Sequence, residues 1–489
     1  MNLGLLHRCE VAIYFSVYIL YIGVGLYQIY LLRDRIVSQA RYGFTPGWPL
    51  LGRKRDNTND DFANFRDYLG IYWPYFIIHL LVSSITKWKW PQLKQHGHVA
   101  VSALALLASL HWTSLSIFAA VLSSFYLAGK RRSKKVTWLL AIAWLCFMDV
   151  VKNNDWWMRQ VDFAETVMVV VSFGWSVLRG CSYCLTKSST NNLVDFLGYM
   201  LYFPSLTTGP LISYERYRTK RETNGWPHLL QSLLRCAFWW LVVQVSFHYI
   251  YVPYMTKHVE VVGWIPSVFW CYAVGYFLGQ FFNTYYMITY GMGVAFAEFD
   301  GIASPSKPRC IGRVHFYSDM WKYFDEGLYE FLFKHIYVEV CRKDSSVLLK
   351  LWGTTLTFIF VYFWHGCYTF VFIWSALNCI CLIAEKFYKA LIDMPAYQNW
   401  MHKHLGFGGT QRFNALLATQ IFIPAAFSNV YFIGGLDIGN FLMRCAYLSG
   451  VGNYLALSFC TYCFFQCSEI VAESKNRQKV KEKLTEKQL

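Results

Sequence analysis

The sequence predicts an all-α polytopic membrane protein with about 10–12 helices that span or re-enter the bilayer. Hydrophobic residues make up 55% of the 489 positions and charged residues only 15%, whereas soluble proteins carry about 25% charged residues. The charged residues lie in gaps between long apolar stretches, which is typical of membrane proteins. The aromatic share of 19%, with 20 Trp, suits belts of aromatic side chains at the two membrane interfaces.

The apolar stretches set the expected helices, because a helix needs about 20 apolar residues to cross a bilayer. The first stretch is expected to be a transmembrane helix and not a cleaved signal, since no small-residue cleavage site follows it. The third is long enough for a helical hairpin, and none alternates as strands of a membrane barrel do. The candidate spans are 11–32, 69–86, 99–129, 136–151, 164–186, 193–213, 232–254, 261–297, 346–364, 367–385, 413–434 and 445–467.

The chain is expected to form one transmembrane domain, 1–467, followed by a basic tail, 468–489, that is disordered and cytosolic. Short loops rich in Lys and Arg face the cytosol in most membrane proteins. The basic loops at 130–135, 216–221 and 307–322 are therefore expected on the cytosolic side.

The early basic loops leave the orientation of the N-terminus open. Both 33–68 and 87–94 are net basic, although they should lie on opposite sides of the membrane. The net charge of +16 does not indicate nucleic-acid binding, because the basic residues sit in short loops between apolar runs. Two Cys-x-x-Cys pairs begin at Cys181 and Cys460, but neither has a second pair or a nearby His, so no metal site is expected there.

The segment from Trp321 to Val340 is predicted to be one amphipathic helix that lies in or dips into the membrane. The charges that recur every four positions, and so share one helical face, are Lys322, Glu326, Glu330 and Lys334. Asp325 falls on the apolar side instead, roughly 120° from the charged stripe. A carboxylate there needs a partner or a water-filled cavity. Asp325 is therefore either a helix-margin residue that reaches water or part of a functional site.

His365 ends an uncharged run, 351–364, and a second apolar run follows it. An ionisable residue inside the membrane is a candidate functional residue. Three other histidines also lie in apolar surroundings, namely His79, His111 and His248. Position alone thus leaves His365 as either a packed, hydrogen-bonded residue or a catalytic one.

Two short motifs inside apolar stretches predict local features of the backbone. Gly209-Pro210 follows Pro204, which indicates either a broken helix beside a cavity or an ordinary kink. Gly291-Met292-Gly293 lacks the third glycine and the flanking strand of a dinucleotide fingerprint, so close helix packing is expected there.

The order of several motifs resembles the membrane-bound O-acyltransferase (MBOAT) family, and within it the Hedgehog acyltransferase branch. Each motif is unspecific alone, whereas their order is specific. The similarity runs over nearly the whole chain and is densest in 196–217 and 300–384, within a catalytic core at 196–385. The motifs are Phe203-Pro204, Gly209-Pro210-Leu211-Ile212-Ser213-Tyr214, Pro308-Arg309-Cys310, Met320-Trp321-Lys322-Tyr323-Phe324-Asp325, Trp364-His365-Gly366 and Asn378.

The resemblance implies a helical fold with a tunnel through the membrane, which acyl-CoA enters from the cytosol and the acceptor from the lumen. His365 matches the family's nearly invariant histidine, and Asp325 matches its second polar position. Many members have Asn or His at that second position, so Asp departs from the broad pattern but agrees with the branch. Trp321 matches a position linked to tunnel gating, and Cys310 one linked to haem contact.

The resemblance further implies a protein-cysteine N-palmitoyltransferase of the endoplasmic reticulum membrane. Its donor would be palmitoyl-CoA and its acceptor the N-terminal Cys of a Hedgehog-type secreted ligand, with an EGF-type ligand also possible. Transfer to an amine needs the neutral amine, whose pKa is about 8, so His365 is expected to act as general base without an acyl-enzyme. Asp325 is expected to orient a partner or the thioester. Arg309, Lys322 and the 216–221 cluster are expected to pair with CoA phosphates.

Three other functions fit the same residues. A transporter would use His365 and Asp325 as a proton relay. An acyltransferase of the same family could act on a lipid hydroxyl or a serine instead of an amine. A non-enzymatic scaffold would not need His365. Membrane lipids are expected partners in each case and nucleic acid in none.

Overall fold

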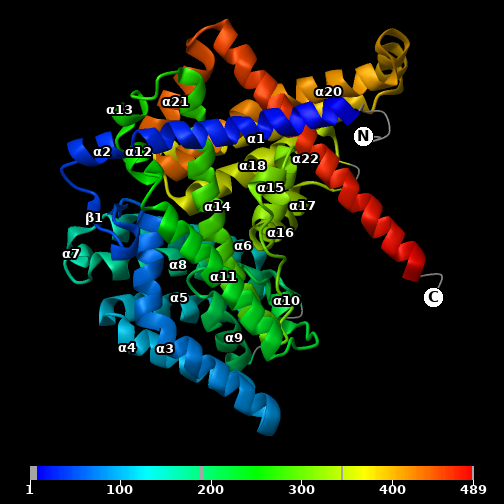
Figure 1. The fold of residues 1–489 in the computed structure, drawn as a ribbon. Helices are drawn as coiled ribbons and strands as arrows, with labels where there is room; N and C mark the ends of the chain where they lie inside the picture. Colours follow the sequence, from blue (N-terminus) through cyan, green and yellow to red (C-terminus); the bar gives the residue numbers. More distant parts are fainter. Residues whose placement is uncertain (1–7, 188–191, 343–344, 487–489) are drawn as a thin grey trace.

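The computed structural model describes residues 8–187, 192–342 and 345–486, and these are almost entirely helical (Figure 1). Nine of the described helices are long and apolar enough to cross a membrane, which confirms the predicted polytopic class. They are Arg8–Gln39, Asp60–Lys89, Trp112–Arg131, Phe163–Leu185, Trp226–Ser246, Val347–His365, Thr369–Ile392, Pro395–Gly434 and Val451–Gln478.

In Figure 1, α14 lies between the N-terminal helices α3 to α6 and the C-terminal helices α18 to α22. The α-helices are α1 (Arg8–Leu31), α2 (Arg33–Gln39), α3 (Asp60–Lys89), α4 (Lys94–Ser109), α5 (Trp112–Arg131), α6 (Lys134–Lys152), α7 (Asp155–Met158), α8 (Phe163–Leu185), α9 (Leu193–Met200), α10 (Tyr214–Arg218), α11 (Trp226–Ser246), α12 (Val252–Lys257), α13 (Val259–Val262), α14 (Val268–Phe299), α15 (Tyr317–Phe324), α16 (Glu326–Leu332), α17 (Val338–Val340), α18 (Val347–His365), α19 (Thr369–Ile392), α20 (Pro395–Gly434), α21 (Leu436–Leu448) and α22 (Val451–Glu486). The 3-10 turns are η2 (Pro49–Leu51), η3 (Pro91–Leu93), η4 (Phe203–Ser205) and η5 (Ile311–Arg313), and η6 (Phe333–Tyr337) is a π-helical turn. Strands β1 (Phe44–Pro46) and β2 (Lys54–Asp56) form one antiparallel hairpin.

Most predicted spans coincide with observed helices. The long stretch 99–129 is two helices, α4 and α5, because the chain turns at Leu110 and His111. His111 caps the second helix, with its Nδ1 2.9 Å from the Thr113 hydroxyl oxygen. The stretch is therefore two helices, as expected, but α4 packs against α3 and α5 against α8, so the two do not form a packed hairpin.

The predicted span 193–213 is wrong, because its second half is a buried loop. α9 ends at Met200, and the chain continues through η4 to a cis peptide bond between Gly209 and Pro210. Proline lacks the backbone N–H that a helix needs, so neither Pro204 nor Pro210 can extend the hydrogen-bond ladder. Of the two alternatives at Gly209-Pro210, the structure shows the broken helix and not the kink.

Two glycines allow this loop to approach its neighbouring helices. A Cβ on Gly293 of α14 would lie 2.3 Å from the Gly209 carbonyl oxygen. A Cβ on Gly327 of α16 would lie 2.1 Å from the Leu211 carbonyl oxygen. The loop therefore runs between α14 and α16, and the close packing expected at Gly293 is confirmed.

Arg179 of α8 holds the same loop from another side. Its side chain is fully buried, and its guanidinium donates to the Met200 carbonyl oxygen at 3.1 Å and to Ser205 Oγ at 2.9 Å. A buried guanidinium must find acceptors, because its desolvation is otherwise unfavourable. The loop backbone supplies these acceptors and is fixed beside α8.

Basic loops that are expected on the cytosolic side lie together on one face of the molecule. Lys134, the first residue of α6 and part of the basic segment 130–135, lies 2.7 Å from Glu339 of α17. Lys334 of η6 pairs with Glu215 of α10. Their shared face agrees with a common side of the membrane, and its cytosolic orientation stays a prediction.

The two early loops lie at opposite ends of α3. At its start, Asp60 pairs with Lys257 at 2.7 Å, beside the β1–β2 hairpin. Beyond its other end, Lys94 donates to the Asp300 carbonyl oxygen at 2.6 Å, and the basic loop after α10 bonds the neighbouring Gly301 carbonyl. The loop between α3 and α4 therefore shares the face of the other basic loops, and the hairpin lies on the opposite face.

The C-terminal segment 468–489 departs from the predicted disorder. α22 continues as a helix to Glu486, and Arg477 pairs with Glu473 one turn earlier at 2.8 Å. Lys and Glu favour helices intrinsically, and ion pairs four residues apart support them. Residues 487–489 lie outside the described residues, and the domain division and cytosolic placement of the tail stay predictions.

Replacing Gly293 by alanine is expected to destabilise the protein, because the added methyl group overlaps the Gly209 carbonyl oxygen. Overpacking of this kind costs about 1–3 kcal/mol, so the thermal unfolding midpoint of detergent-purified protein should fall by several degrees. Gly70→Ala is the matched control, since Gly70 is also helical and a Cβ there meets nothing within 4 Å. Equal midpoints for the two variants would contradict the close approach.

Candidate active site

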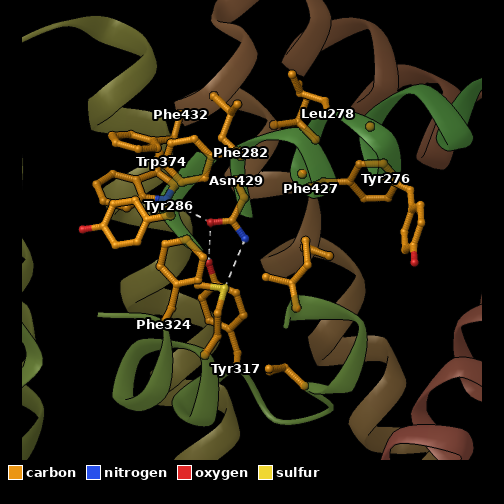
Figure 2. A pocket seen from close by; sticks show the side chains of 18 of the residues that line it. Tyr276, Leu278, Phe282, Tyr286, Tyr317, Phe324, Trp374, Phe427, Asn429 and Phe432 are labelled. Carbon is orange, nitrogen blue, oxygen red and sulfur yellow. Dashed lines mark hydrogen bonds between the residues drawn. The ribbon is translucent and has the colours of Figure 1, made fainter. Parts of the chain in front are cut away.

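A cavity of about 560 Å³ lies among α1, α8, α14 to α16, α18 to α20 and α22. This volume is within the range of about 300–1,000 Å³ that is usual for ligand sites. Most of the lining side chains are aromatic or aliphatic (Figure 2), and the few polar ones include Asp325, His365 and Asn429. An apolar cavity with a few convergent polar groups is the usual form of a binding or reaction site.

The helix predicted from Trp321 to Val340 is broken at Asp325, which corrects the sequence prediction. α15 ends at Phe324, and Asp325 adopts a non-helical conformation with φ −130° and ψ 85°. Its Oδ1 accepts a hydrogen bond from Leu328 N at 2.9 Å, so Asp325 is the N-cap of α16. Aspartate is a favoured N-cap because its side chain satisfies a free N–H of the first turn. The break places the carboxyl group in the cavity.

Tyr286 of α14 supplies the second donor to Asp325, from its hydroxyl to Oδ2. Its ring stacks on Phe324, with centroids 4.7 Å apart (Figure 2). Burial raises the pKa of the Asp325 carboxyl above its usual range, while the hydrogen bonds from Tyr286 and the backbone lower it. Because Asp325 is only 7% exposed, it is not a helix-margin residue that reaches water.

His365 is the last residue of α18, and Gly366 ends that helix with φ 98°, a conformation that favours glycine. The imidazole packs edge-on against Trp374 of α19 and Phe432 of α20, with centroids 5.1 and 4.9 Å away. Trp374 and Phe432 stack on each other at 4.3 Å (Figure 2). Among the described residues, none hydrogen-bonds the imidazole, so both its nitrogens are available to a bound molecule. His365 and Asp325 line the same cavity.

The family model for MBOAT, the membrane-bound O-acyltransferase family, matches residues 123–428, a segment that contains both His365 and Asp325. This chain belongs to the membrane-bound O-acyltransferase family. It is 52% identical to the protein-cysteine N-palmitoyltransferase Rasp of Drosophila melanogaster, over 98% of each chain. It is 25% identical to the protein-cysteine N-palmitoyltransferase HHAT of Mus musculus, over 72% of this chain and 79% of the relative. It is 24% identical to the HHAT-like protein of Mus musculus, over 87% of each chain. The predicted family and acyltransferase class are confirmed.

Trp321 lines the same cavity as His365 and Asp325. Its indole N–H donates to Asn378 Oδ1 at 2.9 Å, and Asn378 of α19 is fully buried. The ring packs against Trp374 with centroids 5.7 Å apart. Trp321 therefore belongs to the same aromatic wall as the rings beside His365, and its gating role stays a prediction.

The structure places Arg309 and Lys322 outside the cavity lining, with exposed side chains. The Arg309 guanidinium lies 3.3 Å from the centroid of the Tyr323 ring, and Lys322 lies beside the same ring at 5.1 Å. Their pairing with CoA phosphates stays a prediction.

Arg216 of α10, which belongs to the basic cluster 216–221, already pairs with carboxylates. Its Nη2 lies 2.7 Å from Glu326 Oε1, and its Nε donates to Glu330 Oε2 at 2.8 Å. Arg218 of the same helix pairs with Asp195 at 3.0 Å. These arginines hold α16 and α9 in place, which makes them poorer candidates for phosphate binding than the sequence suggested.

Cys310 is a half-buried free thiol at the start of η5 and is not among the cavity-lining residues. A Cβ on Gly312 would lie 3.6 Å from Cys310 Sγ and within 3.7 Å of the Tyr18 and Tyr276 hydroxyls, so little space is left between these groups at Gly312. A single thiol offers one axial ligand at most. The haem contact that the resemblance implies for Cys310 stays a prediction.

Sequence reasoning missed Tyr286, Tyr317 and Asn429 as site residues. Asn429 Oδ1 accepts from the Tyr317 hydroxyl at 2.9 Å and from Trp374 Nε1 at 3.3 Å (Figure 2). These hydrogen bonds fix the position of the Trp374 ring, which packs against His365. The available signal was an uncharged polar residue within an apolar run, which is weaker than the signal from an ionisable one.

Tyr286→Phe should destabilise the protein through Asp325, because it removes a donor to a buried carboxyl group. Loss of such a bond costs about 1–3 kcal/mol, and the thermal midpoint should fall. The fall should be much smaller when Asp325→Asn is already present, since the two residues are directly coupled. Tyr285→Phe is the control, because it removes the hydroxyl of the neighbouring tyrosine, whose ring packs against Phe62 with centroids 5.4 Å apart. Equal losses of stability in both backgrounds would show that the Tyr286 hydroxyl does not act on Asp325.

Proposed function

We propose that this chain transfers palmitate from palmitoyl-CoA to the N-terminal cysteine of a Hedgehog-type secreted ligand, in the endoplasmic reticulum membrane. An EGF-type ligand is a second candidate acceptor. The observation that carries the proposal is the apolar cavity that holds both His365 and Asp325. The relatives Rasp and HHAT are named protein-cysteine N-palmitoyltransferases, which supports the same acceptor chemistry here.

The cavity suits the acyl chain of the donor, because burying each CH₂ group of a fatty chain gains about 0.8 kcal/mol. Aromatic and aliphatic side chains from α8, α14 and α20 line it, and they exclude water from the bound chain. The thioester then lies where the polar groups His365 and Asp325 enter the cavity. Arg309 and Lys322 are exposed outside it and can pair with the CoA phosphates.

The reaction is a direct transfer. The neutral N-terminal amine attacks the thioester carbonyl carbon, so that the new C–N bond forms, the C–S bond breaks and CoA leaves as a thiolate. His365 takes the amine proton and returns it to the thiolate. A neutral imidazole has a free ring nitrogen that can accept that proton.

Asp325 orients the thioester or the incoming amine. Its carboxyl group is held by Leu328 N at 2.9 Å and by the Tyr286 hydroxyl, so its position relative to the cavity is set before substrate binds. Preorganised polar groups of this kind lower the barrier because they need no rearrangement during the reaction. No step of the transfer involves Cys310 or haem.

Amide-linked palmitate should form on a peptide that begins with Cys and not on its N-acetylated form. Purified protein, palmitoyl-CoA and each peptide are incubated, and the product is identified by mass spectrometry and hydroxylamine resistance. His365→Ala should lower the rate about 100- to 10,000-fold, the usual contribution of a general base. His404→Ala changes an exposed histidine of α20 and should leave the rate unchanged.

Unimpaired amide formation by His365→Ala would remove this residue from the reaction. Ester-linked palmitate on a Ser-initiated peptide or on lipid, without amide, would favour a hydroxyl acceptor. Binding of palmitoyl-CoA with no transfer to either acceptor would favour the proton-coupled transporter.

A further inference from the structure

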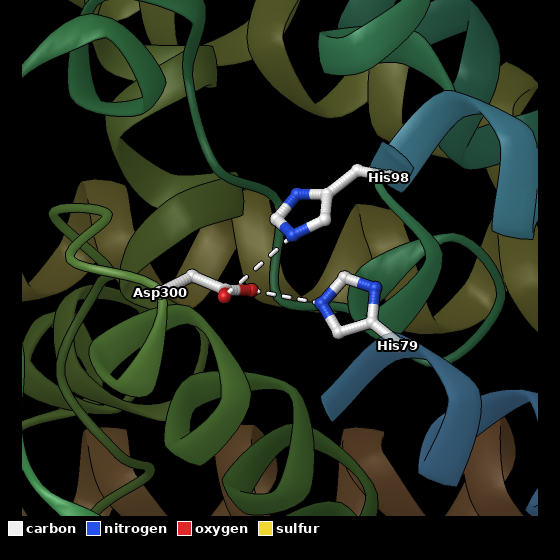
Figure 3. Close-up of side chains that lie close together, drawn as sticks. All are labelled: His79, His98 and Asp300. Carbon is white, nitrogen blue, oxygen red and sulfur yellow. Dashed lines mark hydrogen bonds and ion pairs between the residues drawn. The ribbon is translucent and has the colours of Figure 1, made fainter. Parts of the chain in front are cut away.

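Two buried histidines converge on one buried carboxylate, away from the cavity. His79 of α3, His98 of α4 and Asp300 at the end of α14 come from three elements that are distant in sequence. Figure 3 shows both imidazoles turned toward the carboxylate. His79 Nε2 lies 2.8 Å from Asp300 Oδ2, and His98 Nε2 lies 3.8 Å from Oδ1. None of the three residues lines the cavity that holds His365.

One carboxylate oxygen of the cluster has no partner and is available to a cation. Asp300 Oδ1 is buried and has no hydrogen-bond partner among the described residues. The nearest groups are His98 Nε2 at 3.8 Å and Lys94 Nζ at 3.5 Å, both too distant for a normal hydrogen bond. Buried carboxylate oxygens are almost always hydrogen-bonded or bound to a cation.

We propose that His79, His98 and Asp300 bind a divalent transition-metal ion, with Zn²⁺ the best match. Imidazole nitrogen and carboxylate oxygen are usual zinc ligands, at about 2.0–2.2 Å. The three ligand atoms lie within 4.8 Å of one another. Ligands at these distances from a tetrahedral ion lie about 3.4 Å apart, so side-chain shifts of up to about 1.4 Å bring the three atoms around one ion.

Two hydroxyl groups adjoin the same point and can complete the coordination. The Tyr202 hydroxyl donates to Asp300 Oδ2 at 2.6 Å, and Ser83 Oγ lies 2.7 Å from His98 Nε2. Tyr202 also begins the buried loop that runs between α14 and α16. A bound ion would therefore tie α3, α4 and α14 to this loop, which makes the site structural and not part of the acyl transfer.

Lys94 is the one described cation beside the cluster, and it opposes a bound metal ion. Its main contact is with the Asp300 backbone carbonyl, at 2.6 Å, and its side chain is 24% exposed. The ammonium group can turn toward solvent when a metal ion occupies the carboxylate. Metal binding and the Lys94–Asp300 contact therefore compete, which gives the proposal a variant that should strengthen binding.

The test uses the full chain, purified in detergent without a histidine tag and stripped with EDTA. Co²⁺ is added, because its visible absorption reports coordination by nitrogen and oxygen, and Zn²⁺ is then used to displace it. The expected result is one Co²⁺ per chain, displaced by Zn²⁺, and a thermal midpoint that rises on addition of Zn²⁺. No Co²⁺ spectrum, together with an unchanged midpoint, would overturn the proposal.

Three variants and one control identify the ligands. His98→Ala and Asp300→Asn should each weaken binding at least about tenfold. Lys94→Met removes a positive charge that lies 3.5 Å from Asp300 Oδ1 and repels a bound metal ion. This variant keeps every proposed ligand and should tighten metal binding roughly tenfold. His228→Ala changes a more exposed histidine, which is paired with Glu298 at 3.0 Å, and should bind as the wild type. Metal binding that persists at wild-type affinity in both ligand variants, or an affinity that Lys94→Met does not change, would refute this site.

Discussion

Two hydrogen bonds to the buried carboxyl group of Asp325, from Leu328 N at 2.9 Å and from the Tyr286 hydroxyl, separate α15 from α16. Because the chain leaves its helix there, α15 can lie along α19, where Trp321 reaches Asn378 at 2.9 Å. α16 then starts in a new direction and packs against the buried loop after α9. A continuous helix would satisfy the backbone equally well, but it would leave the carboxyl group on an apolar face without a donor. The cavity exists in this shape because that alternative is disfavoured.

The same constraint explains the polar groups around the cavity. A buried polar group without a partner costs about 1–3 kcal/mol, and the membrane interior offers little water to replace one. The indole N–H groups of Trp321 and Trp374 accordingly find amide oxygens, on Asn378 and Asn429. The imidazole of His365 packs edge-on against two rings and has no hydrogen-bond partner among the described residues. In the proposed mechanism, the aromatic rings position the histidine and the substrate supplies its hydrogen bonds.

Much of this architecture could be predicted from the sequence, because apolar runs of sufficient length have few alternatives to spanning helices. The division of 99–129 into two helices and the close packing at Gly293 could be predicted, and a broken helix at Gly209-Pro210 was one of two alternatives. His365 and Asp325 stood out through motif order, since periodicity alone placed Asp325 on a continuous helix that does not exist. The contacts that define the site could not be predicted from the sequence. Tyr286 and Asp325 are 39 residues apart, and Trp374 and Asn429 are 55 apart, so only the folded chain brings them together.

The central claim is that His365 and Asp325 act on one acyl donor inside a single apolar cavity. The most direct measurement is a cryo-electron microscopy structure of the full chain in lipid nanodiscs, with a non-hydrolysable thioether analogue of palmitoyl-CoA. The account predicts an acyl chain between α8, α14 and α20, with the carbonyl position of the analogue facing both His365 and Asp325. An acyl chain bound elsewhere, or a carbonyl position remote from His365, would contradict it.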